Sequence, residues 1–143
     1  MPNLPDWLSD DASINGAVRL LRRVPSGRLS GCRPDTSNFR VSGAVDPITG
    51  IVLGLSVTVW QTAGDLEDVL RFNEQFGVLC LNAEQVREQG LEIVRYPLVG
   101  NLNHCEVYGQ LSSSKRNALR NAARWVRFPE NYPEHCIELL EKF

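Results

Sequence analysis

The sequence lacks several features that would assign a function directly. No apolar stretch approaches the length of about 18 residues that a membrane-spanning helix requires. No G-x-x-x-x-G-K-[ST] motif is present, so hydrolysis of nucleoside triphosphates is not expected. Residues 1–13 have neither the basic start nor the apolar run of a signal peptide. These absences favour a soluble cytoplasmic protein that does not enter a membrane, although a protein exported without a signal peptide would have the same features.

Cysteine and histidine are few and scattered. The four cysteines form no Cys-x-x-Cys pair, and neither His104 nor His135 has neighbours typical of a metal ligand set, so no metal site is predicted. A chain of 143 residues is long enough to bury a core without disulfides, so all four thiols are expected to be reduced. Cys80 and Cys105 lie in apolar runs and are expected in the core.

Length and composition indicate one folded domain over residues 1–143. The hydrophobic share of 43% and the charged share of 22% are close to globular averages, and no low-complexity segment divides the chain. Residues 1–13, rich in proline and aspartate, are the candidate flexible segment.

The pattern of apolar residues predicts an α+β fold, a mostly antiparallel twisted sheet of five to six strands packed by three to four helices. Runs with alternating or continuous apolar residues predict strands over 18–24, 39–45, 51–60, 78–81, 91–96 and 104–111. Helical spacing predicts helices over 65–76, 82–90, 112–126 and 133–143.

Local signals support several of these boundaries. Pro47 and Gly50 in Asp-Pro-Ile-Thr-Gly predict a hairpin turn between two strands. Asn82 followed three residues later by Gln85 resembles a capping box, and Ser112 is a good helix N-cap.

Charge is unevenly distributed although the net charge is only -2. Residues 14–45 contain six arginines and one acid, residues 115–127 contain five bases and no acid, and residues 46–106 contain nine acids and three arginines. Either these segments neutralise one another across the fold, or the two basic segments converge on an anionic ligand such as a phosphate-bearing cofactor.

The second basic segment is a candidate surface for an acidic protein partner. On a helix over 112–126 its arginines would form one stripe, and guanidinium groups bind carboxylates and phosphates in a bidentate manner. Nucleic acid is not the expected partner, because Trp125 is the only aromatic residue on this helix and lies off the stripe. The stripe consists of Arg116, Arg120, Arg124 and Arg127.

His104 and Glu106 are candidate catalytic residues. Because side chains alternate along a strand, these two residues would share one face, with Cys105 on the other. A histidine and a carboxylate on one face can transfer or position a proton, although a strand histidine satisfied by its neighbours would follow the same pattern.

Three segments in chain order resemble the ADP-ribosyltransferase-like fold, which includes small bacterial effector toxins. They are Leu-Leu-Arg-Arg-Val, Gly-Leu-Ser-Val and His-Cys-Glu-Val, on an early, a middle and a late strand. The resemblance implies that Arg22 or Arg23 contacts the phosphates of NAD as co-substrate, that Ser56 orders the nicotinamide pocket, and that Glu106 stabilises the oxocarbenium ion.

Two functions from different classes follow from the sequence. The first is a toxin-like or effector-like ADP-ribosyltransferase relative that uses NAD and has a cognate antitoxin. The second is a non-catalytic immunity or adaptor module that binds an acidic protein through its basic helix.

Overall fold

The protein has an α+β fold built on one antiparallel sheet of six strands. The computed structural model describes residues 9–25, 27–41, 43–71, 73–130 and 132–136. Neighbouring strands follow the order β6-β7-β4-β1-β5-β8, and every pair is antiparallel. These strands are β1 (Arg19–Val24), β4 (Leu55–Val59), β5 (Gly77–Asn82), β6 (Glu92–Arg95), β7 (His104–Tyr108) and β8 (Arg124–Arg127).

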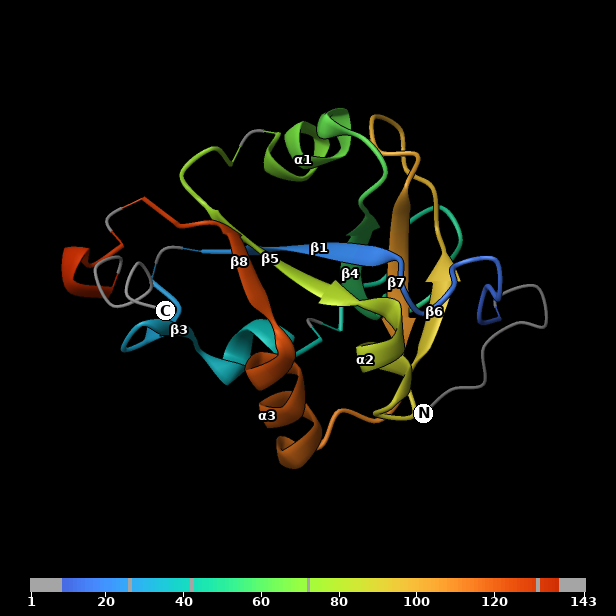
Figure 1. Ribbon diagram of the computed structural model, residues 1–143. Coiled ribbons are helices and arrows are strands. Elements are labelled where there is room, and N and C mark those ends of the chain that lie inside the picture. The colour runs from blue at the N-terminus through green and yellow to red at the C-terminus, as the bar shows by residue number, and fades with distance from the viewer. Residues whose placement is uncertain (1–8, 26, 42, 72, 131, 137–143) are drawn as a thin grey trace.

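The two faces of the sheet are covered unequally (Figure 1). The helices α2 (Ala83–Arg87) and α3 (Ser113–Ala122) and the 3-10 helix η1 (Thr36–Phe39) lie on one face, where the largest apolar cluster contains Phe39, Val86 and Leu119. On the other face α1 (Ala63–Leu70) packs Val69 and Leu70 against the sheet. We call this second side the α1 face; one short helix leaves parts of it open.

Three helix starts are capped by side chains, two of them as predicted. The Ser112 hydroxyl accepts a hydrogen bond from the Lys115 N–H at 3.4 Å, and the Asn82 N–H donates to Gln85 Oε1 at 2.9 Å. At α1, Asp65 Oδ2 accepts the N–H groups of Gln61 and Thr62, both at 2.8 Å. This cap starts α1 at Ala63, two residues before the predicted position.

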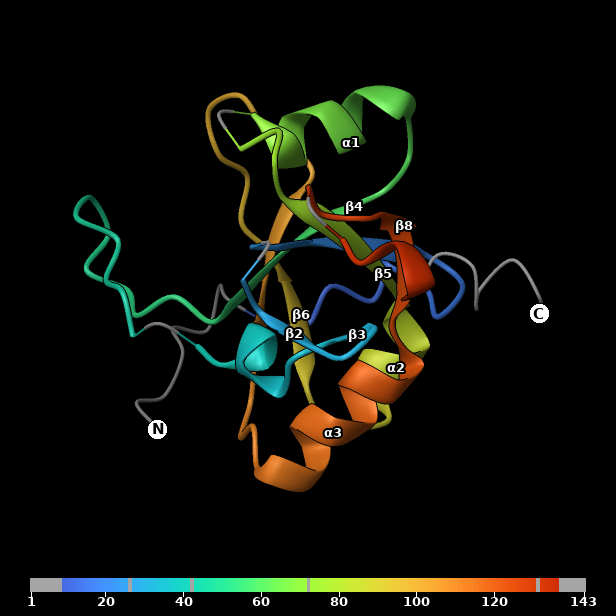
Figure 2. The ribbon, with the colours of Figure 1, turned by 90° about the vertical axis from the view of Figure 1, so that its left-hand side faces the viewer.

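The predicted strand over 39–45 is wrong. Thr36–Phe39 is the 3-10 helix η1, whose N-cap Asp35 accepts the Ser37 N–H at 2.7 Å, and Phe39 is fully buried. The predicted Asp46–Gly50 turn is present, with a positive φ of 73° at Gly50, but only an isolated bridge between Val45 and Val52 flanks it. This 45–52 loop projects from the body of the molecule (Figure 2).

The predicted helix over 112–126 ends early, at Ala122. Residues 124–127 instead form β8 at the edge of the sheet, with Trp125 opposite Leu79 of β5. Arg124 Nη1 donates to the carbonyls of Asn121, Ala122 and Ala123, which satisfies the end of the helix. The aromatic and β-branched pair Trp-Val therefore follows its strand preference once β5 offers an edge.

Cys32 and Cys136 form a disulfide across a sequence separation of 104, so the expectation of four reduced thiols is wrong. Cys32 lies between the short strands β2 (Leu29–Ser30) and β3 (Arg33–Pro34), and its carbonyl accepts hydrogen bonds from Trp125 Nε1 at 3.4 Å and from the Tyr132 hydroxyl at 2.5 Å. Of the predicted C-terminal helix, residues 137–143 lie outside the described residues.

The described part of the candidate flexible segment is tied to the sheet. Asp10 accepts hydrogen bonds from the Ile93 N–H at 2.8 Å and from Arg87, and Asp11 forms an ion pair with Arg95 at 2.9 Å. Residues 1–8 lie outside the described part of the chain.

Candidate functional site

One carboxylate oxygen joins the three candidate catalytic residues. In the pairing of β4 with β7, Ser56 lies directly opposite Glu106, and Thr58 opposite His104, so all four share the α1 face. The Ser56 hydroxyl donates to Glu106 Oε2 at 2.7 Å, and His104 Nε2 lies 2.5 Å from the same oxygen. The prediction that His104 and Glu106 share a face is confirmed.

Glu106 is fully buried, with 0% of its side chain exposed, whereas 11% of the His104 side chain is exposed. Its second oxygen, Oε1, has no hydrogen-bond partner among the described residues. A buried polar atom without a partner costs free energy of folding, about 1–3 kcal/mol for a neutral group and more for a charged one. A buried polar atom without a partner therefore calls for an explanation, such as local strain or a catalytic role.

Arg22 reaches this cluster from the opposite face of the sheet. On β1 it alternates with Leu20 and Val24, which belong to the main core, but β1 and β4 pair only at two positions and then separate. At the separation Arg22 Nη1 donates to the Ser56 carbonyl and Nε donates to the Asn38 carbonyl, both at 2.7 Å. The guanidinium is therefore fixed next to the strand that carries Ser56.

The charge of Arg22 is coupled to Glu106. Burial lowers the pKa of Arg22 to about 10, and the nearby Glu106 carboxylate opposes this shift. Arg22 therefore remains positively charged at neutral pH and partly balances the buried carboxylate, although the two groups form no direct ion pair within the described residues.

A cavity of about 540 Å³ opens beside the cluster, within the size range of small-molecule sites. Ser56, His104 and both arginines of β1, Arg22 and Arg23, line it, whereas Glu106 lies directly behind Ser56 and His104. Arg23, which alternates with Arg22, projects from the α1 face and is exposed. The structure thus brings together the five predicted catalytic and cofactor-binding residues.

Two loops complete the rim of this cavity, and sequence reasoning assigned no role to either of them. The 45–52 loop is held by the Tyr96 hydroxyl, which donates to Asp46 Oδ2 at 2.5 Å and lies 3.0 Å from Thr49 Oγ1. From the 97–103 loop, Asn101 Nδ2 donates to Thr58 Oγ1 at 3.0 Å. The available signal was a pair of asparagines, Asn101 and Asn103, in a short loop between two strands, since such loops often carry function.

The hydrogen bond from Tyr96 also sets the charge of the 45–52 loop. It lowers the pKa of Asp46, and burial together with this carboxylate raises the pKa of Tyr96. The loop therefore holds an ionised Asp46 at the rim of the cavity at neutral pH.

The bonding pattern does not match a serine hydrolase or a resident metal site. The Ser56 hydroxyl and His104 both form a hydrogen bond to Glu106, whereas the hydroxyl of a nucleophilic serine must donate its hydrogen bond to the histidine.

Among the described residues, one group of three metal-ligating side chains is compact enough to hold an ion. It consists of Cys32, His135 and Cys136. The sulfurs of its two cysteines form the disulfide, and none of the three residues lines the cavity beside Ser56.

No match was found. Comparisons with protein families, with curated proteins and with solved structures yield no relative of this chain. In the part of the chain that the structure describes, no helix has the length and apolar character needed to cross a bilayer.

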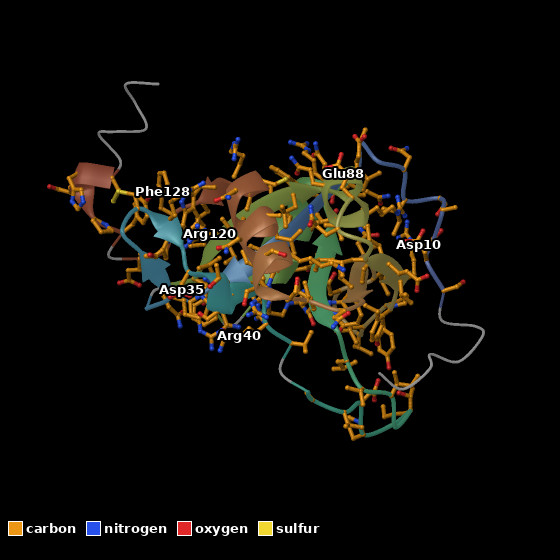
Figure 3. The ribbon with its side chains drawn as sticks, turned by 90° about the horizontal axis from the view of Figure 1, so that it is seen from below. Asp10, Asp35, Arg40, Glu88, Arg120 and Phe128 are labelled. Carbon is orange, nitrogen blue, oxygen red and sulfur yellow. A yellow bond between two sulfur atoms is a disulfide. The ribbon has the colours of Figure 1, made fainter. Side chains whose placement is uncertain are left out.

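The four arginines of the predicted docking stripe do not form one helix face. Arg116 and Arg120 lie on α3, whereas Arg124 and Arg127 lie on β8. Arg116 donates to the Leu111 carbonyl at 2.6 Å, Arg127 donates to the Glu74 carbonyl, and Arg120 lies near Asp35 (Figure 3). The physical reason for the error is the early end of α3, since the 3.6-residue period does not continue into a strand.

Proposed function

We propose that the protein is an ADP-ribosyltransferase-like enzyme that uses NAD as co-substrate, in the manner of a toxin or effector domain. The supporting observation is the hydrogen bond between Ser56 and Glu106 beside the fixed guanidinium of Arg22, at one wall of a cavity. Arg22 and Ser56 lie 34 positions apart along the chain, and Ser56 and Glu106 lie 50 positions apart. Their order and their meeting point agree with the roles that the family resemblance implies.

The chemistry required is cleavage of the bond between nicotinamide and ribose. Nicotinamide leaves with the bonding electron pair, positive charge develops on the ribose as an oxocarbenium ion, and a nucleophile then forms the new bond to the ribose. The buried Glu106 carboxylate supplies negative charge in a water-poor site, where an electrostatic effect on the transition state is large.

The other residues have distinct roles in this proposal. The exposed Arg23 can donate hydrogen bonds to the phosphates of NAD. Arg22, whose Nε and Nη1 donate to the Asn38 and Ser56 carbonyls, adds positive charge from the opposite face of the sheet. Ser56 and His104 line the cavity and hold Glu106 Oε2, so they contact the ligand while the carboxylate acts from one hydrogen bond behind them. Glu106 Oε1 has no hydrogen-bond partner among the described residues, so no donor is committed to it.

The test compares NAD binding and NAD consumption in the wild type and in Glu106→Gln. The amide keeps the shape of the side chain but removes its charge, so we expect turnover to fall by about 100-fold or more, as for loss of an electrostatic group in other enzymes. Glu92→Gln is the matched control, because Glu92 is exposed on the neighbouring strand β6. Equal turnover of both variants, or a wild type that neither binds nor consumes NAD, would remove the proposal.

The alternative, a non-catalytic immunity or adaptor module, depends on a basic helix. Arg116 and Arg120 lie on α3 and Arg124 and Arg127 lie on β8, so the four arginines do not form the single helix face that motivated it. We therefore base the proposed function on the cavity at the Ser56–Glu106 pair.

A further inference from the structure

We propose that a second cavity, on the α1 face near β5 and β8, binds a small phosphate-bearing aromatic ligand of the mononucleotide class. This site is distinct from the Ser56–Glu106 cavity and does not depend on the function proposed for it. The second cavity has a volume of about 520 Å³, again within the range of small-molecule sites. Its lining includes Arg19, Trp60, Cys80, Asn82, Arg124 and Trp125.

The register of three strands assembles this site. Arg19 of β1 lies opposite Asn82 of β5, and Cys80 of β5 lies opposite Arg124 of β8. Because Cys80 and Asn82 are two residues apart on one strand, all four side chains belong to the same face. The first and the second basic segments of the sequence thus each contribute one arginine to a common cavity.

The cavity has an unbalanced positive charge. Its lining contains two arginines and no aspartate or glutamate, and neither arginine forms an ion pair with any residue that the structure describes. Arg124 uses Nη1 for the carbonyls at the end of α3, which leaves Nε and Nη2 without partners among the described residues. A phosphate accepts two such parallel donors, so Arg124 is pre-positioned for an anion.

Trp60 gives the cavity its aromatic character. The Arg19 guanidinium lies 4.2 Å from the centroid of the Trp60 ring, which holds the cation in place without neutralising it. Trp125 also borders the cavity, but it lies opposite Leu79 and packs against the main core, so its ring belongs to the other face of the sheet. A planar base that stacks on the Trp60 ring would gain about 1–3 kcal/mol.

The size and charge favour a single nucleotide over a nucleic acid strand. Two guanidiniums without an ion pair among the described residues suit one phosphate group, and the cavity volume suits one base with its sugar. A strand-binding surface needs a basic track over several nucleotides, whereas this protein has a net charge of -2.

Cys80 provides a readout inside the cavity. It is free and half-buried, and burial raises the pKa of its thiol, so alkylation is measured at alkaline pH. Cys105, the other free cysteine of the described residues, is fully buried and serves as an internal control. A ligand in the cavity should shield Cys80 from iodoacetamide and leave Cys105 unreactive in every sample.

The experiment follows the alkylation of Cys80 by mass spectrometry while AMP or CMP is titrated. We expect saturable protection by both nucleotides, and at least tenfold weaker protection by inorganic phosphate or by adenosine. Arg19→Gln and Arg124→Gln should each weaken protection by about tenfold or more, the loss of a charge-assisted contact. Arg33→Gln removes an exposed arginine outside the cavity and should leave protection unchanged.

Several outcomes would overturn this site. They are an unchanged alkylation rate with all ligands, equal protection by phosphate and by AMP, and full protection in both arginine variants. Stronger protection by an oligonucleotide than by CMP at equal nucleotide concentration would also overturn it. NAD consumption is measured on Arg19→Gln in parallel, because an unchanged rate separates this site from the Ser56–Glu106 cavity.

Discussion

Reduction of the Cys32–Cys136 disulfide should lower the stability of the fold substantially. The bond closes a sequence separation of 104 residues, which is most of the chain. The loss of loop-closure entropy in the unfolded chain corresponds to about 4.7 kcal/mol for a loop of roughly 100 residues, and native disulfides contribute about 2–5 kcal/mol. For a domain of this size that range corresponds to a fall in Tm of about 7–17 °C.

The assay combines a thiol count with calorimetry. The denatured protein without reductant should expose two free thiols, those of Cys80 and Cys105, and reductant should lower the Tm. The double variant Cys32→Ser with Cys136→Ser should have the lower Tm with or without reductant, whereas Cys80→Ser should behave as the wild type. Four reactive thiols in the oxidised protein, or a Tm insensitive to reductant, would refute this reasoning.

Two further predictions concern the supports of the Ser56–Glu106 site. Gly54→Ala should destabilise the fold by about 1–3 kcal/mol, because a Cβ at Gly54 would lie 2.2 Å from the Val107 carbonyl oxygen. Gly27→Ala is the control, since a Cβ at Gly27 would meet no atom within 4 Å. Urea unfolding compares the two variants, and equal unfolding midpoints would contradict the clash. Burial alone would raise the pKa of Asp65, but hydrogen bonds from Asn103, Thr62 and Gln61 lower it below 3.8. The contribution of Asp65 to folding stability is therefore present above pH 3.8, and it is lost as the pH falls through the lower pKa of the folded state. Asp65→Asn should therefore flatten the acid limb of a stability profile below about pH 4, and an unchanged limb would contradict this role.

Local sequence signals were sufficient for part of the fold. The apolar run before Pro25 and the run around Cys80 predict β1 and β5, and the structure confirms both strands. The Asn82–Gln85 and Ser112 caps are also confirmed, because a helix cap depends on residues within one turn. The faces of His104 and Glu106 follow from alternation along a strand, which needs no tertiary information.

The remaining features depend on contacts between distant residues. Residues 124–127 continue a helical pattern in the sequence, and only the edge of β5 selects a strand there. The Cys32–Cys136 pairing spans 104 positions, and no local pattern encodes it. Cys80, predicted as core, is half-buried at the second cavity, because α1 covers the sheet beside it only in part.

The candidate site shows the same division. Alternation predicted which residues of one strand share a face, but it did not predict that Ser56 pairs with Glu106 or that Arg22 enters from the opposite face. Register between strands is set by the packing of the whole sheet. The family resemblance supplied the candidates, and the cavity beside them could be described only from the structure.

The most direct test of the central claim is a titration of the ¹⁵N-labelled protein with NAD, followed by NMR. If Arg22, Ser56 and Glu106 form an NAD site, the backbone amides of Ser56 and His104 and the side-chain amide of Asn101 should shift together in a saturable manner. Exposed positions away from both cavities, such as Gly27, should not shift. A protein whose spectrum is unchanged by NAD, or whose shifts avoid β4 and β7, would contradict the account.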